Sequence, residues 1–218
     1  TFMEAAFIEN AYGRRAYLYK IISDAEQFKA DDAVNPKRNG LFNRNAGAVN
    51  ELFDRPATTY NKGGAVLHML REQLGDEAFW RGVRAYLNRH KFGNVESSDL
   101  RRTMEEASGK DLGWFFEQWV YGLGYPKITV RQAYNAASRT LTLTAAQTQK
   151  PEKFGPAAFR IPLSVEIKSG SETRSEKIEL TKRTGTFSFK LAGRPSRVEF
   201  DKDEKVPIKT VKVLPPRR

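Results

Sequence analysis

The feature that most constrains the fold is a change in the spacing of apolar residues at Tyr125-Pro126. Before this point apolar residues recur every three to four positions, as in "AVLHMLREQLG", which is the period of an amphipathic helix. After it, segments such as "RTLTLTAAQ" alternate apolar with polar residues, as in the strands of an antiparallel sandwich. The sequence therefore predicts a helical unit over residues 1–125, a β-sandwich over residues 126–213 and a tail over residues 214–218.

Glycines divide the helical half into segments. Gly13 interrupts the first amphipathic stretch, and three further glycines end predicted helices: Gly75, Gly93 and Gly109. We expect Asp76 and Ser98 to cap the helices that they precede, because their side chains accept hydrogen bonds from free backbone N–H groups. Residues 29–49 are polar and rich in Asn, Gly and Pro, which predicts a long irregular loop; such loops are often functional.

The second half contains alternating segments over residues 127–135, 139–147, 159–168, 172–180, 186–191 and 197–201. Pro162 lies inside the third segment and has no N–H to donate, so we expect it at a sheet edge or in a bulge. The final "VLPPRR" cannot continue a ladder well and is predicted to be the end of the fold or a linker stub.

The charge of the chain is unevenly divided. Its net charge is +11, and all of it arises in residues 126–218, because residues 1–125 carry 17 basic and 17 acidic side chains. The basic residues are spread over many segments without aromatic interleaving, so a solvated basic surface is expected and nucleic acid is not an expected partner. The chain has no cysteine, which excludes disulfides and thiolate chemistry, and no membrane segment is predicted. A cytoplasmic and an exported location are both compatible with these features.

Residues of the usual hydrolase sites are scarce. The only histidines are His68 and His90, on different predicted helices and outside any H-E-x-x-H arrangement. His68 falls near an apolar stripe and is predicted to be packed, whereas His90 is placed to meet the negative end of its helix dipole. No G-x-S-x-G, phosphate-binding loop or dinucleotide fingerprint is present.

One helix begins unusually, with the stretch "TTYNKGG" that contains Tyr60, Lys62, Gly63 and Gly64. Each glycine weakens a helix by roughly 1 kcal/mol relative to alanine, so the pair predicts that another backbone passes close by. By themselves, Tyr60 would be a packing residue and Lys62 a solvated side chain of the first turn.

The segment that follows is similar to the M1 family of zinc aminopeptidases, the gluzincins. The likeness spans residues 58–130, in the order expected for that family. Its motifs are Tyr60-x-Lys62-Gly63, Gly75-Asp76-x-x-Phe79-Trp80, His90-x-Phe92-x-Asn94, Ser98-Asp99-Leu100, Phe115-Phe116-x-x-Trp119 and Gly124-Tyr125-Pro126. The resemblance implies the helical half of a thermolysin-like catalytic domain followed by the family's sandwich domain.

The resemblance also implies a catalytic role for Tyr60. In M1 enzymes the tyrosine of this motif donates a hydrogen bond to the oxyanion of the tetrahedral intermediate at the zinc ion. A phenol that keeps its proton at neutral pH suits that task, because it offers a donor without adding a charge. Gly63 and Gly64 would let their helix pack close to the zinc-bearing helices.

Other family elements do not occur in this sequence. H-E-x-x-H, the N-E-G-F-A segment with the third zinc ligand and the G-x-M-E-N loop that holds the substrate amine are all missing. "TFMEAAF" resembles the continuation of the helix that carries the third ligand. We therefore expect Zn²⁺ only in the parent enzyme, with no metal ligand in this chain, and we expect the chain alone to be inactive. Its expected partners are a peptide substrate and the missing N-terminal part of the same protein.

Two alternatives stay open. The chain could belong to a non-catalytic scaffold that keeps the M1 architecture without the chemistry. Alternatively, residues 126–218 could form a basic sandwich that binds polyanions, which salt-dependent retention on heparin or DNA would indicate.

Overall fold

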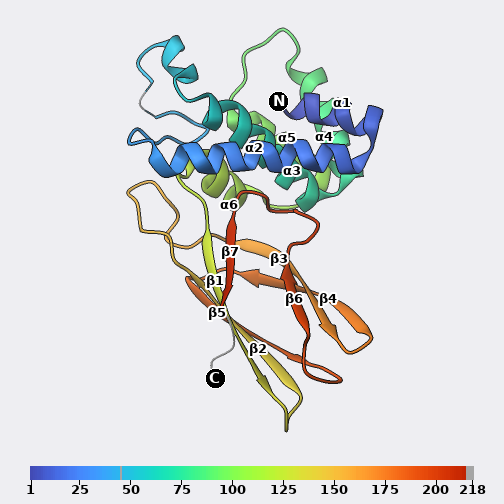
Figure 1. Ribbon diagram of the computed structural model, residues 1–218. Helices are drawn as coiled ribbons and strands as arrows, with labels where there is room; N and C mark the ends of the chain where they lie inside the picture. The colour runs from blue at the N-terminus through green and yellow to red at the C-terminus, as the bar shows by residue number, and fades with distance from the viewer. Residues whose placement is uncertain (45, 215–218) are drawn as a thin grey trace. The chain divides into compact units, whose positions relative to one another are not determined.

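The computed structural model describes residues 1–44 and 46–214. The chain forms two compact units, Thr1–Gly124 and Tyr125–Arg218, and Figure 1 shows helices in the first and strands in the second. The fold is therefore a helical unit followed by a β-sandwich, as the change of apolar period predicts. The predicted tail lies largely outside the described residues, since only Leu214 of it is described.

The first unit is built from α-helices, with a long connection between α2 and α3 and shorter ones elsewhere. The α-helices are α1 (Phe2–Tyr12), α2 (Arg14–Val34), α3 (Gly63–Leu74), α4 (Asp76–His90), α5 (Ser97–Ser108) and α6 (Gly113–Phe116). Shorter helical segments of other types are the 3₁₀-helix η1 (Val49–Phe53) and the π-helices η2 (Ala57–Lys62) and η3 (Glu117–Tyr121). Figure 1 shows α2 as a long helix, and α1 and α3 both pack against it.

The core of this unit follows the predicted apolar stripes. Tyr17, Ile21 and Phe28 occupy one face of α2 and are fully buried. Leu70 of α3 and Phe79 of α4 are also buried, at 1% and 0% exposure. Burying a side chain of this size contributes roughly 1.5–3 kcal/mol relative to leaving it exposed, so these stripes hold α2, α3 and α4 together.

The predicted loop over residues 29–49 is wrong at its start, because α2 continues to Val34. Two acidic residues in this last part of the helix have basic partners in the segments that follow. Arg38 donates to Asp32 with its Nε 3.0 Å from Oδ1, and Arg55 pairs with Asp31. These ion pairs come from outside the helix, so the polar composition of residues 29–34 does not reveal them.

The predicted helix caps are also wrong. Asp76 is the first residue of α4, after Gly75 at the cap position, and its carboxylate accepts two hydrogen bonds from Arg71, both at 2.8 Å. Ser98 lies inside α5, where Glu96 is the cap and forms a capping box with Asp99. In both cases an acidic side chain near the helix start satisfies a donor, but at a different position from the one expected.

The second unit is a sandwich of two sheets. The strands are β1 (Lys127–Asn135), β2 (Thr140–Gln147), β3 (Ile161–Ser169), β4 (Glu172–Leu180), β5 (Thr184–Lys190), β6 (Arg197–Phe200) and β7 (Thr210–Leu214). One sheet has the order β5-β2-β1-β7 and the other β4-β3-β6. Inward residues alternate with outward ones, as in β3, where Ile161, Leu163, Val165 and Ile167 are buried.

Strand β7 was not predicted, and it pairs parallel with β1 in an otherwise antiparallel sheet. The first two residues of "VLPPRR" do continue a ladder, because Val213 and Leu214 pair with Val130 and Arg131; the rest of the segment lies outside the described residues. Pro162 lies in the central strand of its sheet, but β6 pairs only with residues 165–168. On that side Pro162 has no neighbouring strand among the described residues, so its missing N–H costs no ladder bond there.

Two buried polar side chains fix the connections of the sandwich. The side-chain amide of Gln147 donates to the Phe159 carbonyl at 2.8 Å and accepts from the Phe159 N–H at 2.9 Å. Asp201 is 1% exposed and accepts from the N–H groups of Lys205 and Val206 at 3.1 and 2.9 Å. It also pairs with Lys209 at 2.7 Å, so one carboxylate closes the turn between β6 and β7.

Candidate functional site

Tyr60 lies in η2, directly before α3. A π-helical segment beside an α-helix is uncommon and is frequently found at functional sites. The Tyr60 side chain is 48% exposed, and its ring stacks on that of Phe53 with centroids 6.3 Å apart and planes 23° apart. The ring is thus supported on one face while about half of the side chain stays accessible.

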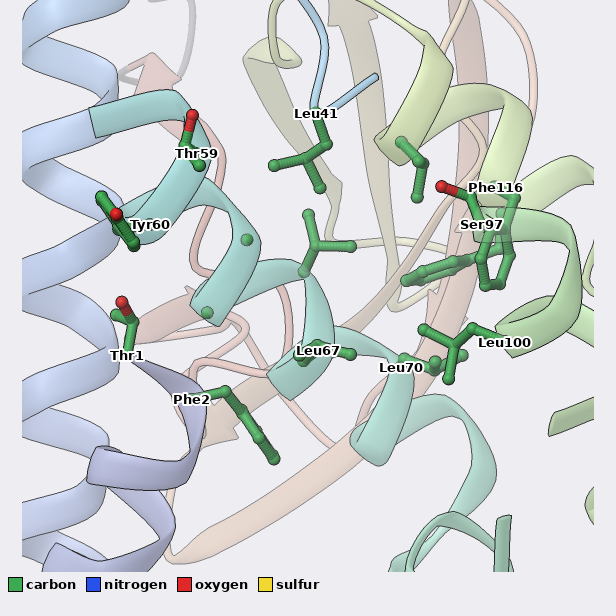
Figure 2. Close-up of a pocket in the computed structure, with 15 residues that line it drawn as sticks. Thr1, Phe2, Leu41, Thr59, Tyr60, Leu67, Leu70, Ser97, Leu100 and Phe116 are labelled. Atoms are coloured by element: carbon green, nitrogen blue, oxygen red, sulfur yellow. The ribbon is translucent and has the colours of Figure 1, made fainter. Parts of the chain in front are cut away.

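Tyr60 also lines a mostly apolar pocket of about 390 Å³. Thr1 and Phe2 of the chain start contribute to it, and α3, α5 and α6 supply most of the apolar lining. In the view of Figure 2, Thr1, Thr59 and Tyr60 lie on one side of the pocket, and Leu100 and Phe116 lie on the opposite side. Leu41, from the loop after α2, lines it as well, so part of that long loop contributes to the pocket wall.

Gly64 brings α3 close to the start of the chain. A Cβ atom at Gly64 would lie 3.1 Å from Cγ2 of Thr1 and 3.6 Å from the backbone nitrogen of Phe2. A second backbone, that of Phe2, does lie next to this glycine as predicted, at an ordinary contact distance, and the tightest contact is with the Thr1 side chain. At Gly63 a Cβ would meet only the side chain of Leu41, at 3.6 Å, so the close backbone approach applies to Gly64 alone of the two.

Lys62 does not have the solvated position that its place in the sequence predicts. It is fully buried, and its Nζ donates to the carbonyl of Gly122 at 3.1 Å. Its ammonium also lies 5.4 Å from the centre of the Phe28 ring, within the range of a cation–π interaction. Burial lowers the pKa of Lys62 to about 8, the charge of Asp32 opposes that shift, and the charges of Arg38 and Arg55 add to it.

The neighbours of Tyr60 in η2 are fixed as well. The Thr59 hydroxyl donates to the carbonyl of Leu52 at 2.8 Å, and the Asn61 side chain donates to Asp24 at 2.9 Å. Asp24 is 2% exposed and also pairs with Lys20 at 2.7 Å. The sequence does not predict these contacts of η2. The one available signal was Lys62, a cation at a helix start, where the helix dipole disfavours a positive charge.

Neither histidine belongs to a group of side chains that could hold a metal ion within the described residues. His68 is fully buried, and its Nδ1 is hydrogen-bonded with the Tyr17 hydroxyl at 2.8 Å, so the prediction of a packed histidine is confirmed. His90 is the last residue of α4 and its ring contacts Tyr86. Across residues 1–44 and 46–214, no group of three or more His, Cys, Asp or Glu side chains could hold a metal ion.

Comparison with known proteins identifies the family. The model of the peptidase family M1 domain matches residues 1–119, which is more than half of the chain. The chain belongs to peptidase family M1. Residues 124–198 of this M1 chain match a second model, a domain of unknown function (DUF3458) with an Ig-like fold.

Named relatives agree with this assignment. Aminopeptidase 2 of Candida albicans is 31% identical to the M1 chain over 162 residues, which cover 71% of the chain and 17% of that relative. Aminopeptidase N of Lactococcus lactis subsp. lactis is 44% identical over 81 residues, 37% of the chain and 9% of the relative. The chain thus spans less than a fifth of the length of these curated relatives.

A solved structure supports the fold. The crystal structure of Legionella pneumophila aminopeptidase A in complex with aspartic acid covers the whole M1 chain with a TM-score of 0.68. The chain covers 23% of that protein and is 18% identical to it, so this likeness concerns the fold alone. Within the described part of the chain, no helix combines the length and apolarity needed to cross a membrane.

Proposed function

We propose that the chain is part of an M1 aminopeptidase that hydrolyses N-terminal residues from peptides, and that Tyr60 contributes the catalytic group of this chain. In this proposal the phenol of Tyr60 donates a hydrogen bond to the oxyanion that forms when water adds to the scissile carbonyl. The observation that carries it is the position of Tyr60. Its side chain is about half exposed and supported on Phe53, at a pocket that it shares with Thr1.

A neutral donor held in place suits this step. A phenol stabilises a developing negative charge without adding a charge of its own, and a donor that is already oriented needs no reorganisation during the reaction. The contacts of Thr59 and Asn61 with their neighbours restrain the backbone on both sides of Tyr60. A restrained, uncharged donor at the pocket supports oxyanion binding as the role of this residue.

We further propose that the Zn²⁺ of the parent enzyme, its ligands and the general base are supplied by residues outside this chain. The described residues do not fit a zinc site, because they contain no suitable group of ligands. The apolar pocket beside Thr1 would be covered by the missing part of the same domain, and the chain alone would bind no catalytic zinc and be inactive.

Two measurements test the proposal. Calorimetric titration of the 218-residue chain with zinc should show no tight stoichiometric site, and such a site would contradict the assignment of the ligands to other parts of the protein. In the full-length protein, Tyr60→Phe should lower kcat by roughly 10²- to 10³-fold, by analogy with other oxyanion donors. A full-length Tyr60→Phe variant with normal kcat would overturn the role of Tyr60.

A further inference from the structure

The buried Lys62 is a charged group for which the proposed reaction has no direct use. It lies two residues after Tyr60 in η2, yet it is fully buried whereas Tyr60 is 48% exposed. Residues two apart in a helix do not share a face, so Lys62 points into the protein while Tyr60 is accessible. Lys62 can therefore influence a substrate only through another residue.

The bond of Lys62 joins segments that are distant in the sequence. Its Nζ donates to the carbonyl of Gly122, directly after η3 and 60 residues away from Lys62. Its ammonium also lies over the ring of Phe28 in α2. A single side chain from the end of η2 thus contacts two other segments of the helical unit.

The environment of Lys62 shows that this contact costs free energy. Removing a lysine charge from water is unfavourable, and neighbouring Arg38 and Arg55 repel it while Asp32 attracts it. An apolar side chain of similar length would fill the same space without that cost. Because the charge of Lys62 costs free energy, we expect Lys62 to fix the position of its neighbours and not only to add stability.

The helix type explains why η2 needs such an anchor. A π-helical turn is less favourable than the α-helical turns of α3, so it persists where surrounding contacts hold it. Three bonds do so: Thr59 to Leu52, Asn61 to Asp24 and Lys62 to Gly122. If η2 relaxed to α-helical geometry, the direction of the Tyr60 side chain relative to α3 would change.

We propose that Lys62 is a positioning residue, whose bond to the Gly122 carbonyl holds η2 so that the Tyr60 phenol keeps one place at the pocket. This inference rests on the proposed function of Tyr60. A misplacement of a catalytic group by about 1 Å can lower a rate by roughly 10²-fold, so a positioning contact far from the substrate has a measurable effect.

The test is a double-mutant cycle in the full-length protein, with a chromogenic aminoacyl anilide as substrate. Lys62→Met should lower kcat about 10- to 100-fold with less than about a threefold change in KM. In a Tyr60→Phe background the same substitution should lower kcat by less than about threefold, because the group that it positions is already absent.

Lys110→Met is the matched control. Lys110 also donates from Nζ to a backbone carbonyl, that of Gln73 at the other end of α3 from η2, at 2.6 Å, but it is exposed. This variant should keep kcat near its original value. If Lys62→Met does not fold, Asn61→Leu tests the same support for η2, since Asp24 keeps its pairing with Lys20.

The outcomes separate the two proposals. An unchanged kcat in the folded Lys62→Met variant, or an equal fall in the presence and absence of the Tyr60 hydroxyl, would overturn the positioning role. A normal kcat in Tyr60→Phe alone would overturn the function proposed for Tyr60 and with it the target of Lys62. A fall in kcat with both single variants and no further fall in the double variant supports both.

Discussion

Gly64 of α3 faces Thr1 so closely that a Cβ atom on Gly64 would lie 3.1 Å from Cγ2 of Thr1. We expect Gly64→Val to destabilise the helical unit by about 1–3 kcal/mol, because its branched side chain needs space that Thr1 and Phe2 occupy. Urea unfolding followed by tryptophan fluorescence measures this unit alone, since all three tryptophans precede residue 125.

Gly63→Ala is the control for that prediction. Its Cβ would meet Leu41 at an ordinary 3.6 Å, and the backbone of Gly63 already has helical angles, φ −57° and ψ −46°. Alanine should therefore stabilise the unit by roughly 0.5–1 kcal/mol. Equal destabilisation by both variants would show that the neighbour of Gly64 is not what limits its side chain.

Lys62 should make the stability of the helical unit depend on pH. Burial lowers the pKa of Lys62 to about 8, whereas an unfolded lysine titrates near 10.5. Between these two values the unfolded chain binds more protons than the folded one, so stability rises as the pH increases through this window. The full change is roughly 3 kcal/mol for a pKa difference of this size.

The pH effect is measured as a difference between variants. Urea unfolding of the original chain and of Lys62→Met, at pH 7.5 and at about pH 10, should show a gain for the original chain that Lys62→Met lacks. Lys110→Met, at an exposed lysine, should behave like the original chain. Identical pH dependence in all three proteins would contradict the burial of a charged Lys62.

The parts of the fold that the sequence predicts are those decided by local patterns. The buried stripe of Tyr17, Ile21 and Phe28 follows from helical spacing, and the alternation in β3 follows from strand spacing. The end of α2 could not be predicted, because partners in later segments, such as Arg38 and Arg55, compensate its acidic residues. Likewise β7 is short, and its parallel partner β1 lies far earlier in the chain.

The candidate site shows the same division. A glycine in a helix predicts a close neighbour, and Gly64 has one in Thr1. The burial of Lys62 could not be predicted, since its partner Gly122 is 60 residues away, and a cation at a helix start is a local signal that does not reveal the partner. The role of Tyr60 comes from the family likeness, and its place at the pocket supports that role without testing it.

Asp201 should be essential for the stability of the sandwich. We expect Asp201→Ala to cost about 2–4 kcal/mol, because it removes the nearer of two carboxylates that pair with Lys209 and the acceptor of the Lys205 and Val206 N–H groups, leaving Lys209 only the longer contact with Glu204. Hydrogen exchange of β3 and β6 measures the loss. Asp203→Ala, at an exposed position in the same turn, should change stability by less than about 0.5 kcal/mol. Similar losses from both variants would contradict this assignment.

Tyr17 should ionise well above the usual range for a tyrosine. Its burial raises the pKa of Tyr17 to about 12, although the nearby charges of Arg71 and Arg14 oppose the shift. The folded chain then binds more protons than the unfolded one between about pH 10 and 12, so the stabilisation from Tyr17 is complete below pH 10 and is lost as the pH rises through about 12.

Ionisation of Tyr17 is measured as the difference in tyrosinate absorbance between the original chain and Tyr17→Phe. This difference should appear only near pH 12 or on unfolding. Tyr19→Phe is the control, since Tyr19 lies on the same helix with 79% of its side chain exposed. Ionisation of Tyr17 together with the exposed tyrosines would show that its hydroxyl is not held in the buried bond with His68.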